Sequence, residues 1–220
     1  MTTQNTPTNR VFDHIIIIMM ENQYCGDVLN NQTMLDIANA GMLIPHSYGV
    51  MHPSYTNYLT SISGQLCNNL TDDFLTGLIQ PTICDRIMAA TAPTTLTWKA
   101  YIEDLNNSDE FRYIERHNPF ASFLTLSTMA PPCIVDYTTL QEDIDNNNLP
   151  NYSWITPNGY NDGHYNFPNN SNPNKLTETE LSELRVQQTA LWLSDLLTNW
   201  GLINNSKNTA TASTFVTGRS

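Results

Sequence analysis

The amino-acid sequence predicts one α/β domain, in which helices flank a central sheet. Three observations support this prediction. The run from Ile15 to Met20 has the length of a strand and is apolar on both faces, which is typical of a strand buried within a sheet. A second short strand pattern lies at 152–156, and a long helical pattern follows at 178–200. With 220 residues, 40% of them hydrophobic, the chain can bury one substantial core.

The first predicted strand ends at a pair of polar residues, Glu21 and Asn22. In open α/β sheets, ligands bind beyond the carboxyl ends of the strands. Both side chains therefore fall where a binding site is expected, although a polar strand-to-loop turn gives the same pattern.

Two further helices are expected in the first third of the chain. One covers 34–40, and another begins within 52–58, where Pro53 suits the first turn and Ser54 can cap the helix, which ends near Gly64. A hydroxyl group at a helix N-terminus lies beside backbone N–H groups, so an anion can bind there.

Two short strands and the start of the long helix complete the predicted elements. The segment 95–101 alternates like a strand, and 42–45 has the composition of another short one. At the start of the long helix, Thr177 and Glu180 have the spacing of a capping box.

The chain is expected to divide into three parts. Residues 1–10 are predicted to be a flexible N-terminus, and 11–203 are predicted to form the α/β domain. Residues 204–220 are small and polar without a strong strand pattern, so they predict a disordered or loosely packed tail.

The composition excludes some partners. The net charge is -12, with only nine Lys and Arg residues, whereas nucleic-acid binding depends on basic side chains. No apolar run approaches the roughly 20 residues of a transmembrane helix. No secretory signal pattern is seen in this chain, and its localisation is left open.

The four cysteines do not form a CxxC pair, which disfavours a zinc ribbon or a thioredoxin-like site. A bridge between Cys67 and Cys84 and four free thiols both remain open. The cysteines are Cys25, Cys67, Cys84 and Cys133.

Five fragments carry a family resemblance. In chain order they are HIIIIMMEN (14–22), HPSYTNY (52–58), YIED (101–104), RHNPF (116–120) and ITPNGYNDGH (155–164). Together they resemble the phosphoesterase family that includes bacterial and fungal acid phosphatases and phosphocholine-type phospholipases C. The resemblance implies an alkaline-phosphatase-like fold with a central mixed sheet flanked by helices, a phosphate ester substrate, and an extracytoplasmic location.

The resemblance also implies roles for the polar residues in these fragments. Glu21, Asn22 and Ser54 would bind a divalent metal ion through oxygen atoms. Ser54 would be the nucleophile and would form a phosphoseryl intermediate. His117 and His164 would act as the acid or as contacts to the phosphate.

Three more residues are candidate substrate contacts. Asn57 lies one helical turn after Ser54 and would donate to a phosphate oxygen. Asn158 and Asp162 lie close in sequence to His164. A helix cap, an exposed amide and structural histidines are the alternatives.

The C-terminal part departs from the family pattern. In the family, the long helix is followed by a strand ending in an Asp-Glu or Asp-Asp pair that completes the metal site, but no Asp or Glu follows Asp195 here. We therefore expect the C-terminal strands to be lacking, metal affinity to be reduced, and an uncovered sheet edge to permit self-association. Two hypotheses remain: a metal-dependent phosphoric ester hydrolase, or a catalytically weak or inactive fold that binds a phosphorylated ligand or self-assembles.

Overall fold

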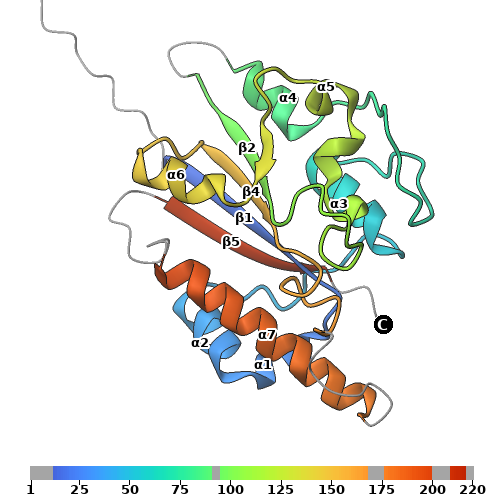
Figure 1. Cartoon of the computed structure of the whole chain (residues 1–220), viewed down its shortest axis with the longest axis vertical. Helices are drawn as coiled ribbons and strands as arrows, with labels where there is room; N and C mark the ends of the chain where they lie inside the picture. Colours follow the sequence, from blue (N-terminus) through green and yellow to red (C-terminus); the bar gives the residue numbers. More distant parts are fainter. Residues whose placement is uncertain (1–11, 91–94, 168–175, 200–208, 217–220) are drawn as a thin grey trace, which may run out of the picture.

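The computed structural model of the protein describes residues 12–90, 95–167, 176–199 and 209–216. It shows a five-stranded sheet in the order β3-β2-β4-β1-β5, with helices on both faces (Figure 1). The predicted α/β class is therefore confirmed.

All strand pairs among the described residues are parallel, so the mixed pairing that the resemblance implied is not seen in this part of the chain. The apolar β1 is an inner strand between β4 and β5, and helices cover both sides of the sheet, which explains why both of its faces are hydrophobic. The strands are β1 (His14–Glu21), β2 (Trp98–Ile102), β3 (Ile134–Asp136), β4 (Tyr152–Thr156) and β5 (Thr209–Val216).

Two sequence predictions about strands were wrong. The expected tail contains β5, which pairs with the whole length of β1, from His14 opposite Thr209 to Glu21 opposite Val216. Backbone pairing with a strongly apolar neighbour allows a small, polar sequence to form a strand, a tertiary effect that its own pattern does not show. Conversely, 42–45 forms no strand: Met42 is 88% exposed, and the segment lies in the loop before α3. Residues 1–10, 204–208 and 217–220 lie outside the described part.

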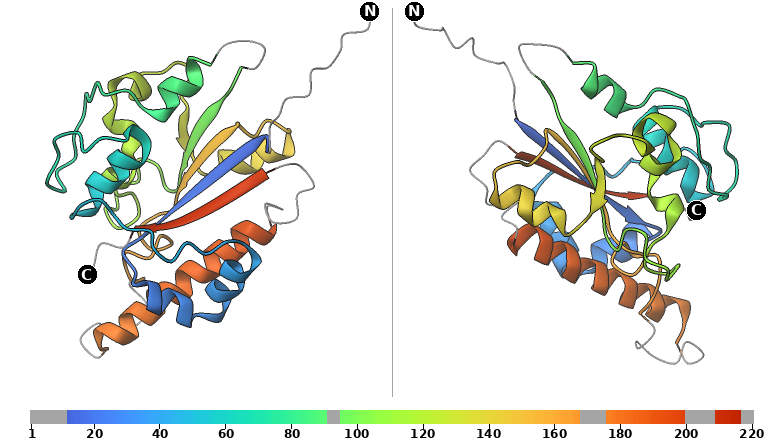
Figure 2. Two further views of the ribbon diagram at one scale, coloured as in Figure 1. Left: turned by 180° about the vertical axis from the view of Figure 1, so that it is seen from behind. Right: turned by 45° about the horizontal axis from the view of Figure 1, so that its top comes forward.

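The helices form one layer on each face of the sheet (Figure 2). One layer packs against Ile16, Ile18 and Met20 of β1, and it contains α1 (Cys25–Asn30), α2 (Gln32–Ala40), α6 (Thr139–Asp145) and α7 (Glu178–Asn199). The other layer packs against Met19, Trp98 and Trp154, and it contains α3 (Ser54–Ser63), α4 (Ile83–Met88), α5 (Leu124–Ser127) and the 3₁₀ turns η1 (Glu115–His117) and η2 (Pro119–Ser122). Alternate strand residues thus serve two separate cores.

Capping residues explain where α7 begins and where α3 begins and ends. At α7, Thr177 and Glu180 form the predicted capping box, with the Thr177 backbone N–H and hydroxyl donating to Glu180 Oε2 over 2.7 and 2.8 Å. At α3, Gly64 ends the helix with φ 68°, but Pro53 occupies the cap position and Ser54 is the first helical residue. Ser54 therefore does not cap α3, and its hydroxyl group is available for another contact.

Two smaller predictions can also be compared with the structure. All four cysteines are free thiols, which decides between the two alternatives. Among the described helices, none combines the length and the hydropathy needed to cross a bilayer.

Candidate active site

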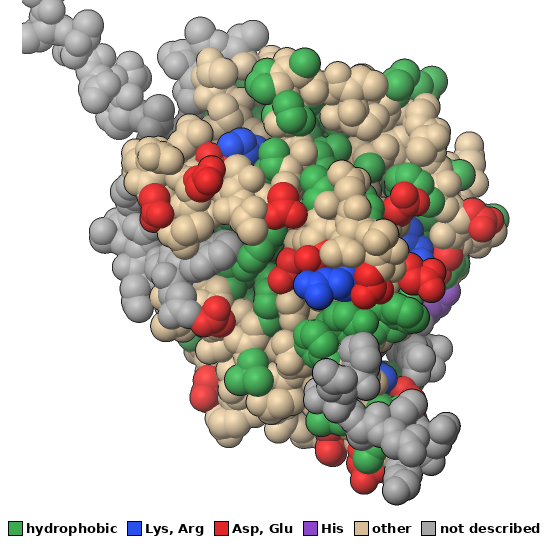
Figure 3. Space-filling model, in the orientation of Figure 1, with side chains coloured by type: hydrophobic (Ala, Val, Ile, Leu, Met, Phe, Trp, Pro, Cys, Tyr) green, Lys and Arg blue, Asp and Glu red, His purple; other side chains and the backbone are tan. Residues whose placement is uncertain are grey.

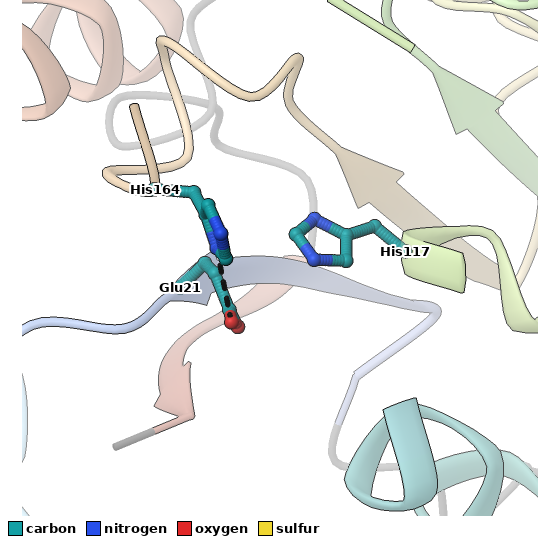
Figure 4. Close-up of side chains that lie close together, drawn as sticks. All are labelled: Glu21, His117 and His164. Carbon is teal, nitrogen blue, oxygen red and sulfur yellow. Dashed lines mark ion pairs between the residues drawn. The ribbon is translucent and has the colours of Figure 1, made fainter. Parts of the chain in front are cut away.

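Three segments that are distant in sequence bring Glu21, His117 and His164 together at the carboxyl end of β1. Glu21 is the last residue of β1, His117 ends the turn η1, and His164 lies in the loop after β4. One carboxylate oxygen and one nitrogen of each imidazole lie within 4.8 Å of one another. Figure 4 shows Glu21 and His164 joined by an ion-pair contact, with the His117 ring beside them. We call these three residues the metal-ligand cluster.

Ser54 meets this cluster from the first turn of α3. Its Oγ donates a hydrogen bond to Glu21 Oε1 over 2.5 Å. The structure therefore brings together two of the three predicted oxygen ligands. Glu21 is fully buried, so the Ser54 hydroxyl is one of the few groups that can solvate its carboxylate.

Asp162 contacts the His117 ring, the His164 backbone and the end of β1. Its Oδ2 is 3.0 Å from His117 Nδ1, its Oδ1 accepts a hydrogen bond from the His164 backbone N–H, and its carbonyl oxygen accepts one from the Glu21 N–H. The side chain is fully buried. Carboxylates commonly lie behind ligating histidines in this way, and the predicted role of Asp162 as a substrate contact stays a prediction.

Burial controls the protonation of this pair. It lowers the pKa of His117 to about 3, and it raises the pKa of Asp162 to about 7. His117 is therefore a neutral imidazole near neutral pH, although its contact with Asp162 has the geometry of an ion pair. A neutral imidazole can ligate a metal ion, but it has no spare proton to serve as a cationic acid.

Three buried polar atoms in the metal-ligand cluster have no hydrogen-bond partner: Glu21 Oε2, His117 Nε2 and His164 Nδ1. Each such atom typically costs about 1–3 kcal/mol when it is left unsatisfied. A divalent cation would satisfy them, and a donor set of one carboxylate and two imidazoles suits a borderline cation such as Zn²⁺ or Mn²⁺. The residues present therefore fit a metal ion, with two nitrogen ligands that the oxygen-based prediction lacked.

Asn22 lies next to Glu21 but faces a different part of the surface. Its backbone has φ 50°, and the residue lines a small pocket of about 110 Å³ with Gln23, Asp27 and Arg185. Its role as a metal ligand stays a prediction.

Asn57 and Asn158 are engaged in local structure. The Asn57 side chain accepts hydrogen bonds from the Val50 and Met51 N–H groups and donates to the Met51 carbonyl, so it fixes the loop before α3. Asn158 accepts from the Tyr160 and Asn161 N–H groups and donates to Asp104. In each amide group the structure shows one donated hydrogen bond to a local partner, which spacing alone cannot show, and the roles of both residues as substrate contacts stay predictions.

Glu103 is a supporting residue that the site predictions did not include, although it lies in the fragment 101–104. Its carboxylate accepts from the Asn158 N–H over 2.8 Å and from the Asn161 amide over 2.9 Å. It thereby fixes the start of the loop that carries Asp162 and His164. The signal was a carboxylate at the end of a predicted strand, but its partners were visible only in three dimensions.

The end of β5 bears on the missing carboxylate pair. The β5 strand follows α7 and lies beside β1, and its register places Val216 opposite Glu21. The side chain of valine has no donor atom for a metal ion. Among the described residues, Glu21 therefore supplies the only carboxylate at the adjoining ends of β1 and β5.

Comparisons with known proteins agree with this architecture. The sequence pattern of the Phosphoesterase family matches residues 27–197. The chain is 28% identical over 165 residues to a phosphate-repressible acid phosphatase of Penicillium chrysogenum, and the match covers 70% of this chain and 39% of that relative. It is 25% identical over 167 residues to a probable acid phosphatase of Kluyveromyces lactis and to an acid phosphatase of Aspergillus fumigatus, with 70% of this chain and 39% and 37% of the relatives covered.

These matches span about two fifths of the length of the curated relatives. The family match covers most of the present chain, and it includes η1 and the loop after β4, which supply two of the three residues of the metal-ligand cluster. The resemblance seen in the five fragments is thereby confirmed, and the chain belongs to the Phosphoesterase family.

Proposed function

We propose that the protein binds a divalent cation through Glu21, His117 and His164 and hydrolyses a phosphate ester with Ser54 as the nucleophile. The observation that carries this proposal is the 2.5 Å hydrogen bond from Ser54 Oγ to Glu21 Oε1, beside three unpartnered ligand atoms. A nucleophilic hydroxyl, a carboxylate within reach of its proton, and a cation site are the groups that phosphoryl transfer requires. Asn22 remains a proposed additional ligand.

The residues suggest a two-step reaction. Ser54 Oγ attacks phosphorus while its proton passes to Glu21 Oε1, and the ester bond to the alcohol breaks. His164 is the more exposed imidazole, with 18% of its side chain accessible, so it lies on the side from which the phosphate group would enter. The leaving alkoxide takes its proton from water. Water then hydrolyses the phosphoseryl group. A bound cation would supply charge neutralisation to the phosphate oxygens.

The position of Ser54 favours this chemistry further. As the first residue of the ten-residue helix α3, it lies at the positive end of the helix dipole, where a phosphate group is stabilised. His117 stacks on Tyr58 of the same helix, with ring centroids 4.8 Å apart, which fixes the distance between α3 and η1.

A second candidate function rests on Val216. The register places Val216 opposite Glu21, so the described part of β5 does not bring the carboxylate pair that the family resemblance implies to this position. We therefore expect slow hydrolysis. Binding of a phosphorylated ligand without turnover is the alternative function.

Hydrolysis of 4-nitrophenyl phosphate with Mn²⁺, Zn²⁺ or Mg²⁺ tests the proposal. A rate that a chelator removes and Ser54→Ala abolishes supports it. The matched control is Ser61→Ala, which removes an exposed hydroxyl group from the same helix and should leave the rate unchanged.

Two outcomes count against the proposal. A rate that survives Ser54→Ala would show that Ser54 is not the nucleophile. Metal-dependent binding of inorganic phosphate without detectable hydrolysis would favour the alternative function.

A further inference from the structure

A pocket of about 430 Å³ borders the candidate active site. Its wall includes Tyr165, which follows His164 and whose ring centroid lies 4.4 Å from that imidazole. It also includes Arg116, the neighbour of His117, and Asp72, whose Oδ1 accepts a hydrogen bond from the backbone N–H of Tyr55. Tyr55 in turn follows Ser54, so the pocket wall is connected to three segments of the site, most directly through the Tyr165 ring.

The size and walls of this pocket suit an organic group. Its volume falls within the range of about 300–1,000 Å³ that is typical of small-molecule sites. Phe111 and Tyr165 meet edge to face with ring centroids 5.0 Å apart, and Phe74 and Tyr113 add two more rings. Aromatic faces bind apolar groups, other rings and organic cations.

The charges on the pocket wall also restrict which groups can bind. Asp72, Glu110 and Glu115 are acidic, whereas Arg116 is the one basic residue among the described residues that line the pocket. Arg116 Nε lies 3.7 Å from Asp72 Oδ2, so much of its charge is already balanced. Over the face seen in Figure 3, Asp and Glu side chains also predominate over Lys and Arg, in line with the net charge of -12.

We propose that this pocket receives the alcohol part of the phosphate ester and selects alcohols that carry a ring or another apolar body and no negative charge. The inference rests on the proposed function, because it needs the phosphate group to lie at the metal-ligand cluster. A second anionic group on the ester would approach Glu110 and Glu115 and be repelled. Polyphosphates and carboxylated esters are therefore poor ligands.

Binding of phosphonates, which cannot be hydrolysed, tests this inference without requiring activity. Three benzylphosphonates with a para hydrogen, a para carboxylate or a para trimethylammonium group are titrated by calorimetry into the full chain with Mn²⁺, alongside inorganic phosphate. We expect the carboxylate compound to bind about fivefold more weakly than the trimethylammonium compound, as two partly screened charge contacts imply.

Variants assign that difference to the pocket. Glu110→Gln with Glu115→Gln should reduce it to about twofold or less, because both carboxylates are exposed and their loss leaves the fold intact. The control is Glu142→Gln with Glu183→Gln, which removes the same charge from exposed positions on α6 and α7 and should preserve the difference. Phe111→Ala should weaken all three phosphonates and leave inorganic phosphate unaffected.

The outcomes separate the two proposals. If inorganic phosphate binds but the three phosphonates bind equally well, or if the control variant changes the selectivity as much as the pocket variant does, the pocket inference is overturned and the proposed function stands. If neither phosphate nor any phosphonate binds in the presence of Mn²⁺, the proposed function fails and the inference fails with it.

Discussion

Replacing Glu21 by Gln keeps the size of the side chain but removes its negative charge. In the metal-free protein, Glu21 is 0% exposed and its Oε2 has no hydrogen-bond partner. Ser54 Oγ and the unpartnered His164 Nδ1 both contact Oε1, so a Gln amide nitrogen in that place can donate one hydrogen to each of them. The substitution therefore removes a buried charge and satisfies an orphaned atom.

Without metal we expect Glu21→Gln to raise the free energy of unfolding by about 1–3 kcal/mol, the usual cost of one unsatisfied buried polar group. For a domain of this size, each kcal/mol shifts the melting temperature by roughly 2–4 °C. With metal bound, the wild type should instead be more stable than the variant. A cation present at about 100 times its Kd stabilises the wild type by about 2.7 kcal/mol, and the variant loses most of this gain with its charged ligand.

Thermal unfolding followed by circular dichroism, once with EDTA and once with Mn²⁺, measures both effects. Glu142→Gln is the control, since it removes the same charge from an exposed position on α6 and should change neither melting temperature. The reasoning is refuted if Glu21→Gln is less stable than the wild type in EDTA and gains as much from Mn²⁺. That result would mean that the carboxylate is satisfied within the protein and holds no cation.

Three other predictions concern the surrounding structure. Gly159→Ala should lower the free energy of unfolding in urea by about 1–3 kcal/mol, because the new Cβ would collide with the Phe111 carbonyl oxygen; an unchanged midpoint would contradict this packing. Burial raises the pKa of Glu103, so the wild type loses stability as pH rises from the unfolded-state pKa of about 4.3 toward the higher folded-state pKa. In urea unfolding the Glu103→Gln variant should become progressively more stable relative to the wild type over this rise in pH, and a constant difference would contradict the shift. Finally, β5 is an outer strand of the described sheet, so light scattering should detect self-association at about 100 μM, whereas a monomer at that concentration would argue against an open edge.

Local patterns in the sequence were enough for much of the fold. The apolar run of β1, the short strand β4, and the capping box and apolar face of α7 each carry their own signal, because burial on both faces, pleating and helix capping leave periodic or positional traces. The weak strand β5 left no such trace. It forms because β1 offers a continuous backbone partner, and pairing partners are not encoded in the segment itself.

The same distinction holds for the site. The sequence by itself determined the residue types and their order: Glu21 at a strand end, Ser54 at a helix start, and both histidines within recognisable fragments. Only the tertiary structure decided that His117 and His164 lie beside Glu21 and that Asp162 contacts the His117 ring. Spacing along a chain shows only which groups are near one another in sequence. The approach of distant segments is set by the packing of both helical layers on the sheet, and that packing depends on the whole core.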